Sequence, residues 1–206
     1  FLGIAKLRAI RRLWAEVLAA CGIAEDRRLM RLHATTAESA WSGRDPWVNM
    51  LRATVATFAG AVGGADSLTV LPYSHVLGLP DGFAPRIARN TQVILAEESS
   101  LARVIDPAGG SWYVETLTEQ LASRAWERFQ AIERAGGMVQ HLSSGAAAAE
   151  CAGAWAERER RIAGRREQLI GVSAFPKLDE KPVDVDSADR EALVAAARQR
   201  LKANAG

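Results

Sequence analysis

The chain has 206 residues, of which 24% are charged and 49% apolar, and its formal net charge is +2. This balance is typical of one globular domain, and so small a net charge gives no global attraction to nucleic acid or to a membrane surface. No apolar run reaches the roughly 18 residues that a membrane span needs, and the first residues lack the layout of a signal peptide. The composition therefore predicts a cytoplasmic protein without nucleic acid or membrane as a partner.

Two further features concern the cysteines and the first residue. Cys21 and Cys151 lie far apart, each in helix-like surroundings, which indicates buried thiols in a reducing compartment and excludes a disulfide framework. The chain begins with Phe1, already inside a helical pattern. We therefore expect a fragment of a longer protein.

The first third of the chain alternates between helical and strand patterns. Apolar residues spaced three and four apart predict an amphipathic helix that ends at Gly22. Residues 29–34 and 67–71 predict short strands, and between them Asp45 and Pro46 predict the N-cap and first turn of a second helix. This alternation favours parallel strands joined by crossover helices. The stripe of the first helix consists of Leu7, Ile10, Trp14, Val17, Leu18 and Cys21.

Two more helices are predicted beyond the second strand. Asp81 is expected to cap the third, and residues 106–110 form a rigid turn because proline and paired glycines prevent a helix from continuing. Trp112 and Val114 follow directly and are expected to anchor this turn in apolar packing. A fourth helix then extends to Gly136. Its apolar side is expected to consist of Leu117, Leu121, Ala125, Phe129 and Ile132.

The character of the chain changes after residue 145. Residues 155–161 predict a strongly charged helix, 173–187 an extended strap with two prolines, and 188–202 a last short helix. In the arginine-rich stretch 158–166 the basic side chains alternate with glutamates, which favours a solvated helix with i,i+4 ion pairs.

Histidines are the first candidates for a site. His33 ends a predicted strand, where it is expected to pack between strand and helix. His75 follows the second strand, where a ligand contact is the alternative to an ordinary loop residue, and His141 is expected at the surface. No two histidines have metal-ligand spacing and there is no Cys/His cluster, so we predict no metal site.

Nucleotide binding and serine hydrolysis find no support. The pair Gly63-Gly64 follows a helix and Gly109-Gly110 lacks the P-loop lysine, so neither matches a dinucleotide or phosphate motif. No serine lies in a G-x-S-x-G elbow. The residues by themselves therefore indicate an α/β domain fragment without a self-contained active site.

Three long strings carry a resemblance to a known family. They are residues 45–52 (DPWVNMLR), 86–92 (RIARNTQ) and 106–115 (DPAGGSWYVE), preceded by residues 4–9 (IAKLRA). In this order and at these separations they resemble the methylmalonyl-CoA mutase family over roughly residues 1–180.

The resemblance implies a fold and a domain plan. The family has a (β/α)8 TIM barrel that binds an acyl-CoA, with a cobalamin-binding domain over its mouth. Residues 1–145 would be the C-terminal strands and helices of the barrel, 146–187 a helical wrap-around extension, and 188–206 the start of a linker helix. The cobalt-ligating D-x-H-x-x-G motif does not occur in these 206 residues.

Departures from the catalytic pattern point to one kind of family member. Catalytic chains typically read Q-T-S-G where this chain has residues 35–38 (TTAE), T-Q-S-L-H-T-N where it has 65–71 (ADSLTVL), and a glutamate where it has His75. Thr35, Glu38, Asp66 and His75 are thus positional equivalents at the barrel mouth, but none is expected to be catalytic or to bind the cofactor. Glu38 also adds bulk and charge where a glycine permits close approach.

The resemblance is therefore strongest to the small, non-catalytic subunit of a two-chain mutase. Such an enzyme interconverts methylmalonyl-CoA and succinyl-CoA by radical rearrangement. Adenosylcobalamin would be bound by the catalytic large subunit or a missing domain, and this chain would serve as scaffold and interface, completed by the missing N-terminal part of the barrel. Two alternatives remain open: a catalytic chain of a divergent acyl-CoA mutase, and a cobalamin-free scaffold protein derived from a mutase barrel.

Overall fold

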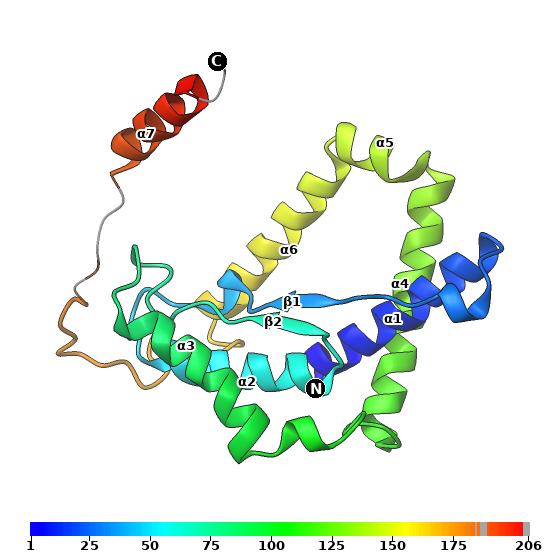
Figure 1. The fold of residues 1–206 in the computed structure, drawn as a ribbon, viewed down its shortest axis with the longest axis horizontal. Coiled ribbons are helices and arrows are strands. Elements are labelled where there is room, and N and C mark those ends of the chain that lie inside the picture. Colours follow the sequence, from blue (N-terminus) through cyan, green and yellow to red (C-terminus); the bar gives the residue numbers. More distant parts are fainter. Residues whose placement is uncertain (184, 186–188, 204–206) are drawn as a thin grey trace.

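Two short strands lie among helices in the computed structural model, which describes residues 1–183, 185 and 189–203 (Figure 1). The strands are β1 (His33–Thr35) and β2 (Ser67–Thr69). The longer helices are α1 (Leu2–Ala20), α2 (Val48–Val62), α3 (Phe83–Val93), α4 (Trp112–Arg134), α5 (Gly137–Ser143), α6 (Ala146–Ala163) and α7 (Arg190–Ala203). None of these described helices is both long and apolar enough to cross a bilayer.

The strands pair in parallel, with His33 opposite Ser67 and Thr35 opposite Thr69. The predicted parallel β-α-β unit is thereby confirmed, with α2 as its crossover helix, although each strand has only three residues. On one face Leu68 lies against α2 so closely that a Cβ at Gly60 would be 2.6 Å from it. The other face is open and polar. The described residues contain this one pair of strands, which shows an α/β fold but not a closed barrel.

Helices α1 and α4 pack along each other through small side chains. Ala5 and Ala9 of α1 and Thr118 and Ala122 of α4 are buried, whereas Trp14 is exposed. The expected stripes of larger apolar residues on these two helices are therefore confirmed only in part. Ile10, Trp14 and Phe129 are exposed, and the half-buried members are Leu7, Val17, Leu18, Leu117, Leu121 and Ile132. Small side chains four residues apart let two helices approach closely, which selects a face that hydrophobicity alone does not.

Two small apolar clusters hold the elements together. One joins Ile4 of α1 and Val62 of α2 to Ala108 and Val114. The other joins Trp41, Ala53, Val70 and Ala88 and fixes α2 and α3 against the loops that follow the strands. The β-α-β unit is thus packed on α1 at one end and on its own loops at the other.

The structure confirms one of the two predicted helix N-caps and contradicts the other. Asp81 Oδ1 accepts hydrogen bonds from the backbone N–H groups of Phe83 and Ala84, as predicted. The prediction for Asp45 is wrong, because α2 begins after Trp47 without a side-chain cap and Asp45 has a φ of +44°. Its backbone N–H instead donates to Glu180, so a long-range contact replaces the expected local cap.

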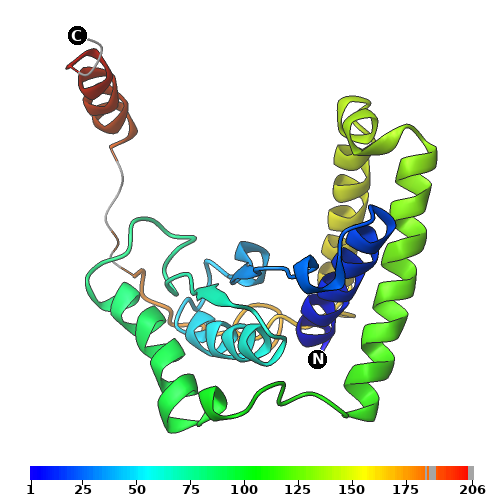
Figure 2. The same ribbon diagram turned by 45° about the vertical axis from the view of Figure 1, so that its right-hand side comes forward.

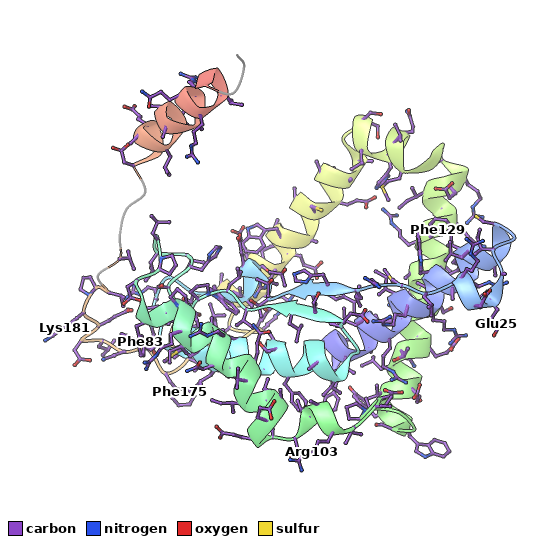
Figure 3. The ribbon with its side chains drawn as sticks, viewed as in Figure 1. Glu25, Phe83, Arg103, Phe129, Phe175 and Lys181 are labelled. Carbon is purple, nitrogen blue, oxygen red and sulfur yellow. The ribbon has the colours of Figure 1, made fainter. Side chains whose placement is uncertain are left out.

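The C-terminal part leaves the sheet along α4 and α5 and returns to the loops beside it along α6 (Figure 1). In both views α5 joins the ends of α4 and α6, and α7 lies apart from the other helices (Figures 1 and 2). Residues 173–183 run along the loops near α2 and α3, and this strap brings Phe175 and Lys181 to the same side of the molecule as Phe83 (Figure 3). The last predicted helix is confirmed as α7, while residues 184, 186–188 and 204–206 of the predicted strap and linker lie outside the described residues.

Candidate functional site

The loops after β1 and β2 lie side by side at the carboxyl ends of the strands. In folds built from parallel strands and helices, this is the end where functional residues gather. Thr36 Oγ1 accepts from the backbone N–H of Leu71 at 2.9 Å, and Trp41 Nε1 donates to the carbonyl of Pro72 at 2.9 Å. The two loops therefore form one connected rim.

Asn49, in the first turn of α2, forms hydrogen bonds to both loops from their buried side. It is fully buried, and its Nδ2 donates to the carbonyls of Ser42 at 2.8 Å and of Tyr73 at 2.9 Å. Its Oδ1 accepts from the backbone N–H of Ser42 at 3.0 Å and from Arg52 at 2.7 Å. A buried amide with both donors and its acceptor satisfied fixes the rim in one conformation.

Glu38 and His75 meet across the rim. His75 Nε2 lies 2.8 Å from Glu38 Oε1, which joins the loop after β1 to the loop after β2. These are two of the four mouth positions singled out in the sequence, and the fold brings them into direct contact. The Glu38 carboxylate, at a position where the family pattern has glycine, is thus directed at a neighbour on the rim.

Of the other two mouth positions, Thr35 is the last residue of β1 and only Asp66 lies elsewhere. Thr35 belongs to the open face of the sheet, while Asp66 directly precedes β2, at the opposite end of the strands. There Asp66 accepts from the backbone N–H of Leu32 at 2.7 Å and pairs with Arg11. These two contacts, the Leu32 bond foremost, hold the pKa of Asp66 below its usual value. The grouping of Asp66 with the mouth is therefore corrected.

The open face of the sheet carries a network of histidine and hydroxyl groups. His33 Nδ1 lies 2.7 Å from Ser67 Oγ, and its Nε2 lies 3.1 Å from Thr69 Oγ1. His33 is exposed, so the prediction that it packs between strand and helix is wrong. The alternation of side chains along β1 places it on the face opposite α2.

The segment from α6 to residue 183, which we call the extension, is hydrogen-bonded to the rim and to α2. Arg158 of α6 donates to the carbonyl of Ser39 at 2.8 Å, and Glu180 accepts from the backbone N–H of Asp45 at 2.6 Å. Arg52 donates to the carbonyl of Ile170 at 2.6 Å. The extension therefore contacts the loop after β1 at both of its ends.

The charged helix forms the predicted i,i+4 pair, with Arg161 3.1 Å from Glu157. Its arginines also do more than face solvent, because Arg158 reaches the rim. Glu167, beyond the end of α6, pairs with Arg158 and Arg161, and the Arg158 bond above all lowers the pKa of Glu167.

The glycine turn at 106–110 is tied to α1 through Arg8. Gly110 has a φ of +76°, and its N–H donates to Glu115 at 3.2 Å. Arg8 pairs with both Asp106 and Glu115. Val114 is buried as predicted, but Trp112 is 89% exposed, so the expectation that Trp112 anchors the turn is wrong.

Two other sequence predictions are corrected. Cys21, just after the end of α1, and Cys151 of α6 are free and exposed thiols, not buried ones. The His141 side chain is only 12% exposed and lies 3.5 Å from Glu150, so it is not a surface residue. Arg128 pairs with the same carboxylate, and this bond lowers the pKa of Glu150.

Sequence reasoning missed Asn49, Arg158 and Glu180, which organise the rim. A signal for Asn49 was present, since it is a polar residue on the side of a helix that otherwise carries Ala53, Thr57 and Gly60. Arg158 and Glu180 lie more than 100 residues from their partners, and nothing near them in the sequence indicates those contacts.

The rim does not fit a corrin ring. Where the family pattern has a glycine for close approach, Glu38 places a carboxylate that is already bonded to His75. A flat ring lying close against this surface would remove the exposed Glu38 carboxylate from water. Within the part of the chain that the structure describes, no three His, Cys, Asp or Glu side chains are grouped as a metal site.

The comparisons with known proteins agree on one family. A family model described as methylmalonyl-CoA mutase matches residues 1–205. The methylmalonyl-CoA mutase small subunit of Streptomyces virginiae is 58% identical over 91% of this chain and 30% of its own length. That of Propionibacterium freudenreichii subsp. shermanii is 45% identical over 89% of this chain and 29% of its own.

A relative without the subunit name is less similar. The methylmalonyl-CoA mutase of Escherichia coli K12 is 36% identical over 90% of this chain and 26% of its own length. The chain thus spans about three tenths of the length of the small subunits it matches. With the family model matching nearly every residue, the chain belongs to the methylmalonyl-CoA mutase family.

Proposed function

We propose that this chain is part of the small subunit of a methylmalonyl-CoA mutase and serves there as scaffold and interface. The assembled enzyme interconverts methylmalonyl-CoA and succinyl-CoA. Higher identity to proteins named small subunit than to the Escherichia coli mutase supports the assignment. Cys21 and Cys151 are free thiols, which supports the cytoplasm as its compartment.

Residues 1–145 are proposed to form the last strands and helices of a (β/α)8 barrel, with 146–187 as its extension and 188–206 as the start of a linker. The parallel pairing of β1 and β2 across α2 supports this, because it is the repeating unit of such a barrel. The remaining strands would pair with the free edges of β1 and β2.

The Glu38–His75 pair is the observation that carries the scaffold role. In a catalytic barrel the mouth must present groups to the acyl-CoA and to the cofactor. Here the two rim side chains bind each other instead. Adenosylcobalamin supplies the radical when bound, and we propose that it is held by the large subunit or by a domain outside this chain. The chain's own residues keep the rim in a fixed shape.

Mixing experiments test this proposal. The full-length small subunit, the large subunit and their mixture are each titrated with adenosylcobalamin while the corrin spectrum and the turnover of methylmalonyl-CoA are followed. We expect spectral change and turnover in the mixture, and neither in the small subunit alone. Stoichiometric micromolar binding of cobalamin by the isolated small subunit would contradict the scaffold role and favour a divergent catalytic chain.

A further inference from the structure

Asp45 has a backbone conformation that its local sequence does not favour. The pair Asp45-Pro46 is typical of a helix start, in which the aspartate has a negative φ and its carboxylate accepts a backbone N–H of the first turn. Here Asp45 has a φ of +44°, and α2 begins without a side-chain cap. Aspartate is one of the few residue types that enter this left-handed region, at a cost relative to its ordinary conformations. Local preference and observed conformation therefore disagree at this position.

Two residues of the extension hold Asp45 in this conformation. Its backbone N–H donates to Glu180 Oε1 at 2.6 Å, although Glu180 is 135 positions away in the chain. Gly171 approaches as well, because a Cβ there would be 3.0 Å from the Asp45 Cβ. A strained backbone persists where the surrounding structure over-determines it. At Asp45 the extension supplies this constraint.

The extension is itself strained close to this contact. Five non-glycine residues of the described chain have a positive φ, and two of them, Arg165 and Phe175, lie on either side of Gly171 in the sequence. Phe175 is 84% exposed, so packing of its own side chain does not hold it in place. Backbone strain that gathers on both sides of one contact is typical of a switch region.

We propose that the contact between Glu180 and Asp45 is a latch with two states. In the latched state, which the structure shows, the Asp45 N–H donates to Glu180. In the released state the strap leaves the loop after β1, Asp45 returns to a negative φ, and its carboxylate caps α2 by accepting the N–H of Trp47. Among the described residues, that N–H has no hydrogen-bond partner in the latched state. A local hydrogen bond thus replaces the long-range one, which keeps the two states close in free energy.

The latch controls the position of α7. The strap leads on to α7, and α7 lies apart from the other helices in both views (Figures 1 and 2). Asn49 holds Ser42 in either state, because the hydrogen bonds between these two residues do not involve the extension. Release therefore moves the strap and α7 while the rim keeps its shape. This inference concerns contacts within the chain and does not rest on the proposed function.

Hydrogen exchange of single backbone amides in the full-length subunit tests the latch. Glu180→Ala removes the acceptor, and we expect the Asp45 N–H to exchange about tenfold faster and the Trp47 N–H about threefold slower. The slower exchange is the specific signature, because the loss of a merely structural contact accelerates exchange at the amides it affects. Asp179→Ala removes the exposed carboxylate next to Glu180 and is the matched control, with changes of less than about twofold at both amides.

Three further variants separate release from the loss of one bond. Glu180→Gln keeps an oxygen acceptor and should leave both exchange rates within about twofold of the unaltered protein. Asp45→Gly, combined with Glu180→Ala, removes the capping carboxylate and should return the Trp47 N–H to its original rate. Gly171→Ala places a Cβ against Asp45 and should open the same contact, with the same pair of changes as Glu180→Ala.

Unchanged or faster exchange of the Trp47 N–H in Glu180→Ala overturns the proposal. Slow exchange that persists when Asp45→Gly is added overturns it too, as do equal effects of Asp179→Ala and Glu180→Ala. Loss of the fold in both Glu180→Ala and Gly171→Ala also contradicts it, because a latch that opens must leave the rest of the subunit folded.

Discussion

At the scale of single residues, Asn49 makes the most consequential contacts. Removing its side chain leaves the buried carbonyls of Ser42 and Tyr73 and the N–H of Ser42 without partners. Each unsatisfied buried group costs about 1–3 kcal/mol, and some of these groups will regain water as the rim loosens. We expect Asn49→Ala to lower the free energy of unfolding of the full-length subunit by about 2–4 kcal/mol, measured by urea denaturation.

Asn90→Ala is the control for this prediction, because Asn90 is an exposed asparagine on the neighbouring helix α3. It should change the free energy of unfolding by less than about 0.5 kcal/mol. Equal effects of the two substitutions would mean that Asn49 does not hold the rim loops.

Glu115 gives a second residue-scale prediction, which concerns pH. The Gly110 N–H bond, and after it Arg8, hold the pKa of Glu115 below its ordinary value of 4.5. The unfolded chain then binds a proton more readily than the folded chain, so this contribution to stability is complete above about pH 4.5 and is lost as the pH falls through the lower folded-state pKa.

Thermal melts of Glu115→Gln and of the unaltered full-length subunit between about pH 7 and pH 3 measure this effect. The variant should be less stable at pH 7, and the difference should shrink as the pH falls. Glu127→Gln, on the same helix but outside the Arg8 network, is the control and should differ little in melting temperature from the unaltered subunit at pH 7. A constant difference for Glu115→Gln would show that the carboxylate charge is not what stabilises the turn.

At the scale of elements, the turn at 106–110 shows how a local motif depends on a distant helix. Gly110→Ala forces a side chain into the left-handed region, which costs about 1 kcal/mol. Gly109→Ala places a Cβ 2.7 Å from Asp106 Oδ2, a group already paired with Arg8, so it should destabilise as well. We expect both to lower the denaturation midpoint of the full-length subunit and to leave the acyl-CoA affinity of the assembled enzyme unchanged.

Gly153→Ala is the matched control, since Gly153 lies inside α6 and a Cβ there would meet nothing within 4 Å. It should stabilise the protein by about 0.5–1 kcal/mol. Unaltered stability of the two turn variants together with a tenfold loss of acyl-CoA affinity would show that the turn is a binding element.

At the scale of the whole molecule, the part of the chain that the structure describes leaves much apolar surface uncovered. Two strands with free outer edges cannot close a barrel, and Leu51, Val55 and Ile105 are mostly exposed. Open strand edges and apolar patches favour aggregation. We therefore expect residues 1–206, expressed alone, to associate and to melt without cooperativity, whereas the full-length subunit melts cooperatively.

Light scattering after size-exclusion chromatography and a thermal melt check this expectation. A monodisperse monomer of 22.2 kDa with a sharp melt would contradict it. Such a result would mean that the contacts between α1, α4 and the β-α-β unit suffice for an independent fold.

The sequence alone determined the structural features that depend on residues close together in the chain. The alternation of helix and strand patterns predicted the parallel pair β1 and β2, Asp81 predicted a helix start, and the string at 106–115 predicted both a turn and the family. These features follow from backbone geometry and local hydrogen bonds, which a short window of sequence contains.

Only the tertiary structure decided which faces are buried and which polar groups meet. Periodicity predicted Trp14 and Phe129 as packing residues, but both are exposed, and α1 and α4 approach through Ala5, Ala9 and Ala122 because small side chains allow a shorter distance between helices. Glu38 meets His75 across 37 positions, and Arg158 meets Ser39 across 119. Contacts at such separations depend on how whole elements pack, and the identity of either partner alone carries no signal for the other.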